Sequence, residues 1–436
     1  MSLKFGTDGV RGRAFTELTE DFARALGAAA VTVLETSSMM IGRDTRESGP
    51  ALQAAFAEGC AAAGASIVDL GVAPTPAVAW MSKSTGQPAA VLSASHNVWH
   101  DNGIKIFAAG GTKISDAAQD AIQELLLRGD VPEVVEPEVT TMSIGPYVDA
   151  VVASIDGRSL EGTRVVLDCA NGAAVDTAAT IFGRLGAEIE LIGVEPDGRN
   201  INDGVGSTYP AEMQKRVLAT EAAVGFAFDG DADRVLACGS DGEMIDGDQI
   251  IAMAAVDRRD RGHLASDTVV ITVMTNLGFR KAMDELGITV VETPVGDRHV
   301  LVALDEGGFS LGGEQSGHVI HRDLVTTGDG VLSAIQLLDA ALRRGVDIGQ
   351  WATQLMTRYP QVLENVRVKT RVKDVDQLLA EDIRAEEDLL GTSGRILVRA
   401  SGTEPLIRVM VEAADRDTAN AVAGRLADAV RRAVPA

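Results

Sequence analysis

Apolar and polar positions follow the same order three times along this chain. The first apolar run of each repeat predicts a buried strand, and these runs cover residues 39–44, 164–169 and 268–274. A stretch with apolar residues at helical spacing follows, as with Leu52, Phe56 and Cys60, and a glycine ends it. A second apolar run then predicts another strand, at residues 66–71, 188–193 and 288–293. This order predicts three related α/β domains with mixed, largely parallel sheets.

The pattern changes near residue 359. Three apolar runs and two amphipathic stretches there predict the order strand, helix, strand, strand, helix, which is typical of a small α+β domain with an antiparallel sheet. We therefore predict four domains, with boundaries at 1–150, 151–252, 253–358 and 359–436. One large doubly wound sheet is the alternative for the first three.

Composition narrows the functional classes. The chain has 436 residues, of which 46% are hydrophobic and 23% charged, as in globular proteins. With 39 basic and 63 acidic residues its net charge is −24, which argues against nucleic acid or an anionic membrane surface as partner. An acidic enzyme acting on an anionic substrate must gather its few arginines in a cleft.

The cysteines and the N-terminus indicate the compartment. Cys60, Cys169 and Cys238 are far apart in apolar stretches, which is typical of reduced core thiols. The first residues lack the apolar core of a signal peptide, and no apolar run is long enough for a membrane span. We expect a cytoplasmic protein without a membrane partner. A homodimer would be unsurprising, because two-fold dimers are the commonest assemblies.

Residues 93–105 contain a serine, a histidine and an Asp-Asn-Gly turn. Ser95 follows an apolar strand-like run, so it lies on a loop at a strand end, where α/β proteins place reactive groups. No G-x-S-x-G motif surrounds it, which argues against an acyl-transfer nucleophile. The alternative to a catalytic role is that Ser95 only bonds to the backbone of its own turn and that His96 has a structural role.

Three aspartates alternate with small residues directly after another apolar strand. Asp229, Asp231 and Asp233 would repel one another strongly unless a cation balances them. Carboxylate oxygens suit Mg²⁺ or Ca²⁺, and the EF-hand spacing is absent. The pattern favours a metal loop over a solvated acidic turn, and three carboxylates would leave Mg²⁺ room for a phosphate oxygen.

Two further loops combine glycine with polar side chains. Residues 312–318 include Glu314, Ser316 and His318. The carboxylate of Glu314 and the hydroxyl of Ser316 suit binding to paired sugar hydroxyls, although polar loops rich in glycine are common. Residues 399–409 offer consecutive backbone N–H groups and two arginines. These residues could form a phosphate-binding loop. An ordinary hairpin connection between two strands is an equally good explanation.

Arginines near two turns complete the candidates. Arg11 lies among glycines and is the better candidate for binding an anion. Arg43 and Arg46, in the loop after the first predicted strand, are further candidates, although a surface ion pair would also explain each of these arginines.

Together these loops resemble the α-D-phosphohexomutase family over essentially the whole chain. The order of serine, metal, sugar and phosphate loops is that of the family. Similar segments are found at residues 4–12, 93–97, 101–105, 276–279, 295–300, 312–318 and 326–330. The chain departs from the family at Val98, where the family usually has proline, so the Ser95 loop is expected to be less restricted.

The resemblance implies a role for each loop. Ser95 would be the phosphoserine, and an oxygen of its phosphate would join the three aspartates on Mg²⁺. Lys105, Arg11 and His96 are the remaining candidates for catalysis; Lys105, His96 and His318 are all candidate general bases, and the resemblance inclines us to Lys105. The substrate-binding residues implied are Arg234, Glu314, Ser316, His318, Arg399, Ser401, Gly402, Thr403 and Arg408.

The resemblance also implies the reaction. Gln315 favours the branch of the family that acts on amino-sugar phosphates. The expected enzyme is an isomerase that interconverts glucosamine 6-phosphate and glucosamine 1-phosphate through a phosphoserine and a 1,6-bisphosphate, feeding UDP-N-acetylglucosamine synthesis. A phosphoglucomutase or phosphomannomutase is the alternative within the family. A magnesium phosphatase with an aspartate nucleophile and a non-catalytic sugar-phosphate sensor are the alternatives outside it.

Overall fold

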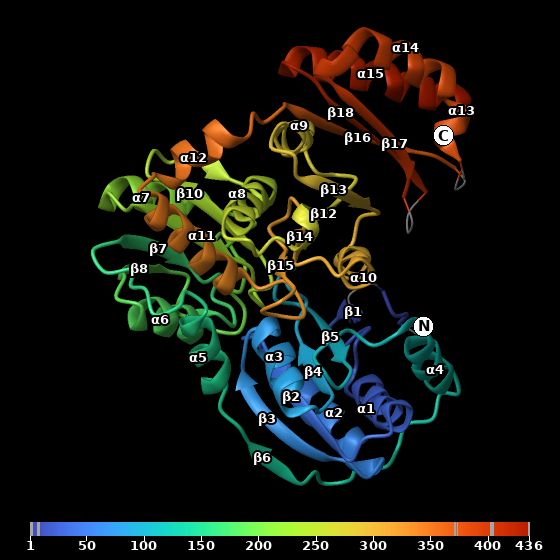
Figure 1. Ribbon diagram of the computed structural model, residues 1–436. Coiled ribbons are helices and arrows are strands. Elements are labelled where there is room, and N and C mark those ends of the chain that lie inside the picture. Colours follow the sequence, from blue (N-terminus) through green and yellow to red (C-terminus); the bar gives the residue numbers. More distant parts are fainter. Residues whose placement is uncertain (1–2, 7–8, 370–371, 373, 402–404, 435–436) are drawn as a thin grey trace. The chain divides into compact units, whose positions relative to one another are not determined.

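Four β-sheets organise the chain in this computed structural model, which describes residues 3–6, 9–369, 372, 374–401 and 405–434 (Figure 1). The chain divides into two units. Unit 1 comprises residues 1–274 and 288–352, and unit 2 comprises residues 275–287 and 353–436. Three sheets belong to unit 1 and the fourth to unit 2.

The first sheet has six strands in the order β1-β5-β4-β2-β3-β6. They are β1 (Val10–Arg13), β2 (Ser38–Arg43), β3 (Ser66–Val72), β4 (Ala89–Leu92), β5 (Asp101–Phe107) and β6 (Val139–Thr141). The helices of this part are α1 (Glu20–Leu34), α2 (Gly49–Ala62), α3 (Thr75–Thr85) and α4 (Asp116–Leu127). Met39 and Ile41 pack in a core with α1 and α2, whereas Met40 packs in another core with α3. Successive side chains of a strand point to opposite faces, so burial of both faces explains the continuous apolar run.

The second sheet has the order β11-β10-β9-β7-β8. Its strands are β7 (Arg164–Asp168), β8 (Glu188–Ile192), β9 (Val224–Phe228), β10 (Val235–Gly239) and β11 (Met244–Ile245), and its neighbouring helices are α5 (Gly145–Ala153), α6 (Val175–Arg184) and α7 (Ala211–Thr220). β7 pairs in parallel with β8 and β9, whereas β9 and β10 form an antiparallel pair. The turn between β9 and β10 carries the three aspartates.

The third sheet has the order β13-β12-β14-β15. Its strands are β12 (Thr268–Thr272), β13 (Thr289–Thr293), β14 (Leu311–Gly313) and β15 (Val319–His321). The associated helices are α8 (Gly247–Asp260), α10 (Asp297–Gly307), α11 (Gly330–Arg344) and α12 (Ile348–Leu355), and a short 3₁₀ turn covers Ala265–Asp267. The antiparallel pair β14 and β15 is joined by the Glu314–His318 turn.

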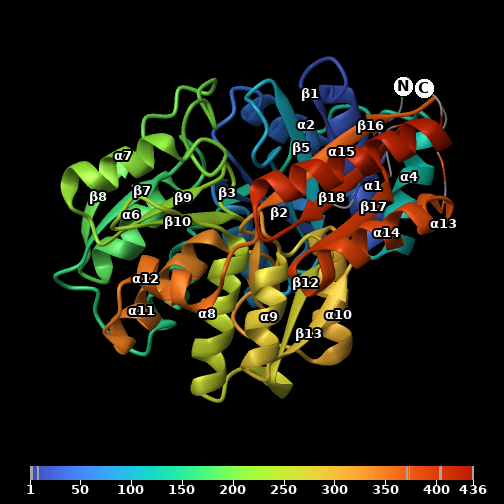
Figure 2. The same ribbon diagram turned by 90° about the horizontal axis from the view of Figure 1, so that it is seen from above.

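The fourth sheet is antiparallel, with the order β16-β18-β17. Unit 2 contains β16 (Gln361–Arg367), β17 (Arg395–Ala400), β18 (Leu406–Glu412), α9 (Leu277–Glu285), α13 (Val375–Leu378), α14 (Ala380–Leu390), the 3₁₀ turn Gly391–Ser393 and α15 (Arg416–Ala433). Helices α14 and α15 lie on the same face of this sheet in two views (Figures 1 and 2). Ala419, Val422, Leu426 and Val430 of α15 are buried in its core, as their helical spacing predicts.

These sheets confirm the predicted fold class. The first three are mixed and contain the parallel pairs expected of α/β units, and the last is antiparallel. The alternative prediction of one large doubly wound sheet is wrong, because β1–β15 form three separate sheets. The boundaries at residues 150, 252 and 358 stay predictions.

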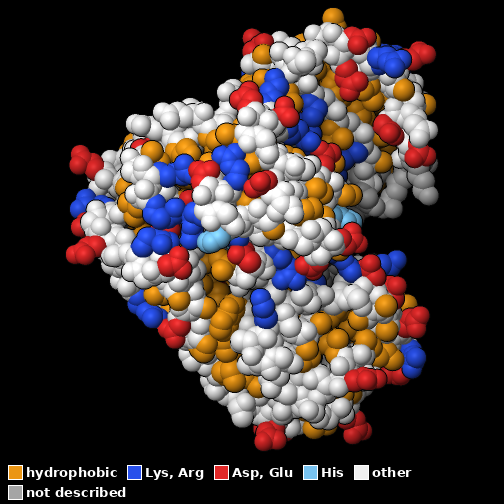
Figure 3. All heavy atoms as spheres, viewed as in Figure 1, with side chains coloured by type: hydrophobic (Ala, Val, Ile, Leu, Met, Phe, Trp, Pro, Cys, Tyr) orange, Lys and Arg blue, Asp and Glu red, His pale blue; other side chains and the backbone are white. Residues whose placement is uncertain are grey.

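Surface and core agree with the composition. The three cysteines are buried and free, as predicted. Acidic side chains are scattered over the face of the molecule in Figure 3 and do not gather in one patch. Among the described residues, no helix has the length and apolar character needed to cross a membrane.

Candidate active site

Ser95 lies in the turn after β4, with its side chain against the aspartate loop. Its Oγ donates a hydrogen bond to Oδ2 of Asp229 at 2.6 Å, although 134 residues separate them in sequence. The side chain is buried, and the backbone adopts a φ of 53°, a left-handed conformation that is uncommon for a residue other than glycine. A serine held in this conformation beside a carboxylate is typical of a functional site.

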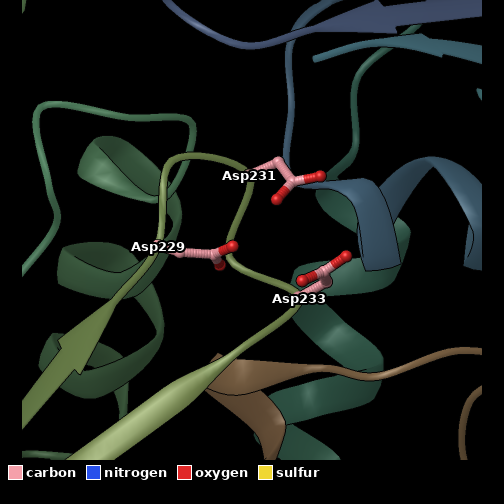
Figure 4. A group of neighbouring side chains, drawn as sticks. All are labelled: Asp229, Asp231 and Asp233. Atoms are coloured by element: carbon pink, nitrogen blue, oxygen red, sulfur yellow. The ribbon is translucent and has the colours of Figure 1, made fainter. Parts of the chain in front are cut away.

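The three aspartates point into one small space (Figure 4). One carboxylate oxygen of each lies within 4.8 Å of those of the other two, and all three residues are buried. Lys105, on β5, contacts two of them: its Nζ is 2.8 Å from Oδ2 of Asp231 and 3.0 Å from Oδ2 of Asp233. Thr75 Oγ1 donates to Oδ2 of Asp231 at 2.6 Å.

This cluster fits a divalent cation. The Oδ1 atoms of Asp231 and Asp233 are buried and accept no hydrogen bond from the described residues. Burial raises the pKa of Asp229 to about 8, and the other two carboxylates add to the effect. Burial also acts to raise the pKa of Asp233, but Lys105 and His318 hold it well below the ordinary value. Orphaned carboxylate oxygens in a buried acidic cluster are what a hard metal ion needs as ligands.

Two candidate proton carriers lie beside the serine and the aspartates. His96 Nδ1 is 3.3 Å from Ser95 Oγ. Burial, together with the nearby cations Arg234 and Arg11, lowers the pKa of His96 to about 4, so its imidazole is neutral at pH 7. Lys105 is ion-paired with two carboxylates, which favours its charged form. The geometry thus offers a neutral imidazole and an ammonium group, and it does not rank them as bases.

A cavity of about 420 Å³ lies next to this cluster. The predicted site residues that line it are Arg11, Asp233, Arg234, Glu314 and His318. Ser316 is exposed in the same turn as Glu314, but it is not among the residues that line the cavity. Cationic and anionic side chains share the wall, which suits a ligand with both phosphate and hydroxyl or amino groups.

His318 links the cavity to the aspartates. Its Nδ1 is 3.6 Å from Oδ1 of Asp233, and its Nε2 accepts a hydrogen bond from the backbone N–H of Gly328 at 3.1 Å. Burial acts to lower its pKa, but Asp233, Asp297 and Glu314 together outweigh this effect, so the pKa is raised overall. Glu314 is held in turn by the backbone N–H of Gly296, which donates to its Oε1 at 3.0 Å. Both side chains are therefore fixed by backbone groups.

In unit 2, two of the predicted phosphate-binding residues lie side by side. Arg399 on β17 is directly opposite Arg408 on β18. Burial lowers the pKa of Arg399, and the charge of Arg408 lowers it further. Ser401 is buried, and its N–H donates to the carbonyl of Leu406 at 2.9 Å. Like charges facing each other across two strands are unfavourable, so this pair suits an anion. Gly402 and Thr403 lie outside the described residues.

Sequence reasoning missed several residues of the site. Lys4 and Asp297 line the cavity, and Lys113 forms an ion pair with Asp297. Residues 295–300 had been noted only for their resemblance to the family, because an aspartate at a helix start usually has a structural explanation. A surface ion pair, which was one explanation for Arg46, is wrong, because the side chain is buried and paired with the buried Asp44. Nothing in the local sequence identifies its partners, which are mainly backbone carbonyls about fifty residues away.

Comparison with known proteins identifies the family. Four models described as phosphoglucomutase/phosphomannomutase domains match the chain: domain I at residues 2–132, domain II at 145–242, domain III at 246–359 and the C-terminal domain at 363–429. The chain belongs to the phosphoglucomutase/phosphomannomutase family. The family models place Ser95 in domain I, the aspartates in domain II, Glu314 in domain III and Arg399 in the C-terminal domain.

Individual members of the phosphoglucomutase/phosphomannomutase family match over the full length. A protein of Frankia alni named phosphoglucosamine mutase is 47% identical, with all of both chains covered. The protein of the same name from Thermobifida fusca is 48% identical over 99% of this chain and 98% of its own. A crystal structure of a phosphoglucomutase/phosphomannomutase family protein from Burkholderia thailandensis superposes with a TM-score of 0.83 at 25% identity, covering 100% of this chain and 99% of that one.

Proposed function

We propose that this chain is a phosphoglucosamine mutase that interconverts glucosamine 6-phosphate and glucosamine 1-phosphate. The observation that carries the proposal is the 2.6 Å hydrogen bond between Ser95 Oγ and Asp229 in a buried aspartate cluster beside a cavity with charged walls. The choice of an amino sugar rests on the full-length relatives named phosphoglucosamine mutase, at 47% and 48% identity. The product would feed UDP-N-acetylglucosamine synthesis.

In the proposed reaction, the resting enzyme carries a phosphoryl group on Ser95. The group moves to the 1-hydroxyl of glucosamine 6-phosphate: a new O–P bond forms at the sugar, the bond to Ser95 Oγ breaks, and the hydroxyl proton passes to a base. The product of this step is glucosamine 1,6-bisphosphate. After the intermediate reorients, a bond forms between Ser95 Oγ and the 6-phosphorus, the bond from that phosphorus to the sugar O6 breaks, and the Ser95 hydroxyl proton passes through the base to O6. Glucosamine 1-phosphate then leaves. Positioning and charge neutralisation supply most of the catalysis in such transfers.

The residues of the site have separate tasks in this proposal. Asp229, Asp231 and Asp233 would hold Mg²⁺, which neutralises charge on the transferring phosphoryl group when it is bound. Lys105 and Arg11 add positive charge, and Lys105, His96 and His318 remain the candidate bases. Glu314 would bind sugar hydroxyls in the cavity, with Arg234 and His318 as neighbours. Ser316, exposed in the same turn, would contact the sugar from outside the cavity wall. Arg399, Ser401, Gly402, Thr403 and Arg408 would bind the phosphate that is not being transferred.

The substrate can be tested directly. Glucosamine, glucose and mannose phosphates are compared at equal concentration, with Mg²⁺ and the matching bisphosphate activator. We expect the amino sugar to be turned over at least about tenfold faster, because an ammonium group and a hydroxyl differ in charge and in hydrogen bonding. A tenfold preference for glucose or mannose phosphate would instead assign the chain to the alternative activity of the same family.

The arginine pair of unit 2 gives a second prediction. Arg408→Ala removes one of two facing charges, so thermal stability should be unchanged or slightly higher. The KM for glucosamine 6-phosphate should rise about 10-fold or more, since a charge-assisted hydrogen bond to phosphate is worth about 1.5–3 kcal/mol. Steady-state kinetics and a thermal melt measure both effects. Arg416→Ala, an exposed arginine at the start of α15, is the control. An unchanged KM for Arg408→Ala would remove this residue from the phosphate site.

Phosphopeptide mass spectrometry separates the proposed mutase from the other classes. Phosphate on Ser95 of the purified protein supports the mutase. Phosphate on Asp229 or Asp231 supports the magnesium phosphatase, and no phosphate after incubation with glucosamine 1,6-bisphosphate supports the sensor. The hydrogen bond between Ser95 and Asp229 favours the mutase, because a phosphatase with an aspartate nucleophile would not need a serine at this position.

The setting of the enzyme is part of the same proposal. We place it in the cytoplasm, where sugar phosphates are made, with a small sugar phosphate as its only ligand besides Mg²⁺ and with no nucleic acid or membrane partner. The net charge of −24 supports this choice of partners. A homodimer is the assembly to test first, by light scattering.

A further inference from the structure

Every polar atom of Ser95 is held by another residue. Its N–H donates to Ser93 Oγ at 2.9 Å, and that hydroxyl donates to Oδ2 of Asp44 at 2.6 Å. Its carbonyl accepts from Arg46 Nη2 at 3.0 Å and from Asn202 Nδ2 at 2.9 Å. The Oγ contacts Asp229 and His96.

Arg46 holds the Ser95 loop at four backbone carbonyls, including that of Ser95. Its guanidinium has five N–H donors, and each finds an acceptor: Nε donates to Asp44 Oδ2, and the two terminal nitrogens donate to the carbonyls of Ser95, Asn97, Val98 and Asp101. The side chain is buried, so water cannot replace these bonds. Lysine has three donors on one nitrogen and cannot reach acceptors spread around a planar group.

Asn202 holds the same loop from a different part of the chain. It lies between β8 and α7, and its Nδ2 donates to the carbonyls of Ser95 at 2.9 Å and Asn97 at 3.0 Å. The residue is buried and has a φ of 57°, which asparagine tolerates better than most residues. Gly230 leaves room for this contact, because a Cβ there would be 2.7 Å from the Ser95 carbonyl and 2.9 Å from Asn202 Nδ2.

We propose that Arg46 and Asn202 are positioning residues for phosphoryl transfer. They fix the two carbonyls on either side of His96, keep Ser95 in its left-handed conformation, and so hold Oγ against the aspartate cluster. Neither residue lines the cavity among the described residues, so neither contacts the substrate there. The inference rests on the proposed function. It also explains how the loop keeps its shape with Val98, which lacks the backbone restriction of proline, since Arg46 binds the carbonyl of Val98.

The test uses the full-length enzyme, phosphorylated with glucosamine 1,6-bisphosphate, and two variants. Arg46→Lys keeps the charge and loses the planar set of donors. Asn202→Asp keeps the size and the tolerance of positive φ, and it turns a donor into an acceptor facing two carbonyls. For each we expect kcat to fall about 10²-fold, because small misplacements of a reacting group have effects of this size, while KM stays within about twofold.

The control is Arg258→Lys, which alters another buried arginine of unit 1. Arg258 is ion-paired with Asp323 and has no contact with the Ser95 loop. Its kcat should remain near that of the wild type, even if its melting temperature falls as far as that of Arg46→Lys.

Three outcomes would overturn the inference: an unchanged kcat in both variants, a rise in KM that accounts for the whole loss, or an equal loss of kcat in Arg258→Lys. If one variant does not fold, the other decides by the same criteria. A wild-type enzyme that fails to transfer phosphate from Ser95 contradicts the proposed function instead, and the two failures are thereby distinguished.

Discussion

Ser95→Ala is expected to reduce turnover of glucosamine 6-phosphate by at least about 10³-fold, or about 4 kcal/mol in the activation free energy. The variant loses the oxygen that carries the phosphoryl group. In the described part of the chain, the nearby hydroxyls of Ser93 and Thr75 are engaged elsewhere: Ser93 Oγ with Asp44 and the Ser95 N–H, and Thr75 Oγ1 with Asp231. Because alanine has about the same difficulty as serine at a φ of 53°, the melting temperature should change little. Coupled turnover assays and a thermal melt measure the two effects.

Ser84→Ala is the matched control for this experiment. Ser84 is exposed on α3, and among the described residues its hydroxyl bonds to the carbonyl of Met81, one turn earlier in the same helix. This variant should retain wild-type activity and phosphorylation. If Ser95→Ala keeps full activity and the wild type carries no phosphate on Ser95, the phosphoserine mechanism is wrong.

Removal of the metal is the second change with a large expected effect. Chelation should lower turnover at least about 10²-fold, since the aspartates would then face the phosphoryl group without a neutralising charge. Added Mg²⁺ should also raise the melting temperature by several degrees, because a ligand at about 100 times its Kd stabilises the folded state by about 2.7 kcal/mol. Asp231→Asn removes one carboxylate charge from the cluster and should abolish both responses.

The thermal response separates metal binding from catalysis. Asp241→Asn serves as the control, since Asp241 is exposed in the turn after β10 and, within the described part of the chain, accepts a hydrogen bond from the backbone N–H of Glu243. That variant should keep the full response to Mg²⁺. A wild-type protein whose melting temperature is insensitive to Mg²⁺, Mn²⁺ and Ca²⁺ alike would contradict a divalent-metal site at the aspartates.

Secondary structure was predictable because it depends on local pattern. The run at residues 164–169 and the helix through Ile181 and Phe182 lie where predicted, as β7 and α6. The glycines chosen as helix ends have positive φ, for example 88° at Gly186. The bounds of β16, which begins at Gln361, were less predictable, because its apolar positions alternate with polar ones. The exposed face of this strand carries polar residues such as Asn365 and Arg367, so composition marks the start of the strand poorly.

The candidate site was predictable only in its separate parts. The three aspartates cluster because one tight turn between two strands places them within a few residues of each other. The contacts that join the parts span longer stretches of chain: 126 residues between Lys105 and Asp231, and 107 between Ser95 and Asn202. Their partners are fixed by the way whole sheets pack, which no local pattern encodes.

By itself, then, the sequence determined the strands, helices and turns, the fold class, and the residue types that could perform chemistry, because hydrophobic spacing and turn residues act over short distances. The tertiary structure alone decided that Ser95 Oγ meets Asp229, that Arg46 is buried with all five donors satisfied, and that Ser316 lies off the cavity wall. Burial and hydrogen-bond partners between distant residues depend on packing in three dimensions. For that reason the positioning of the serine, and not its identity, is what the structure adds.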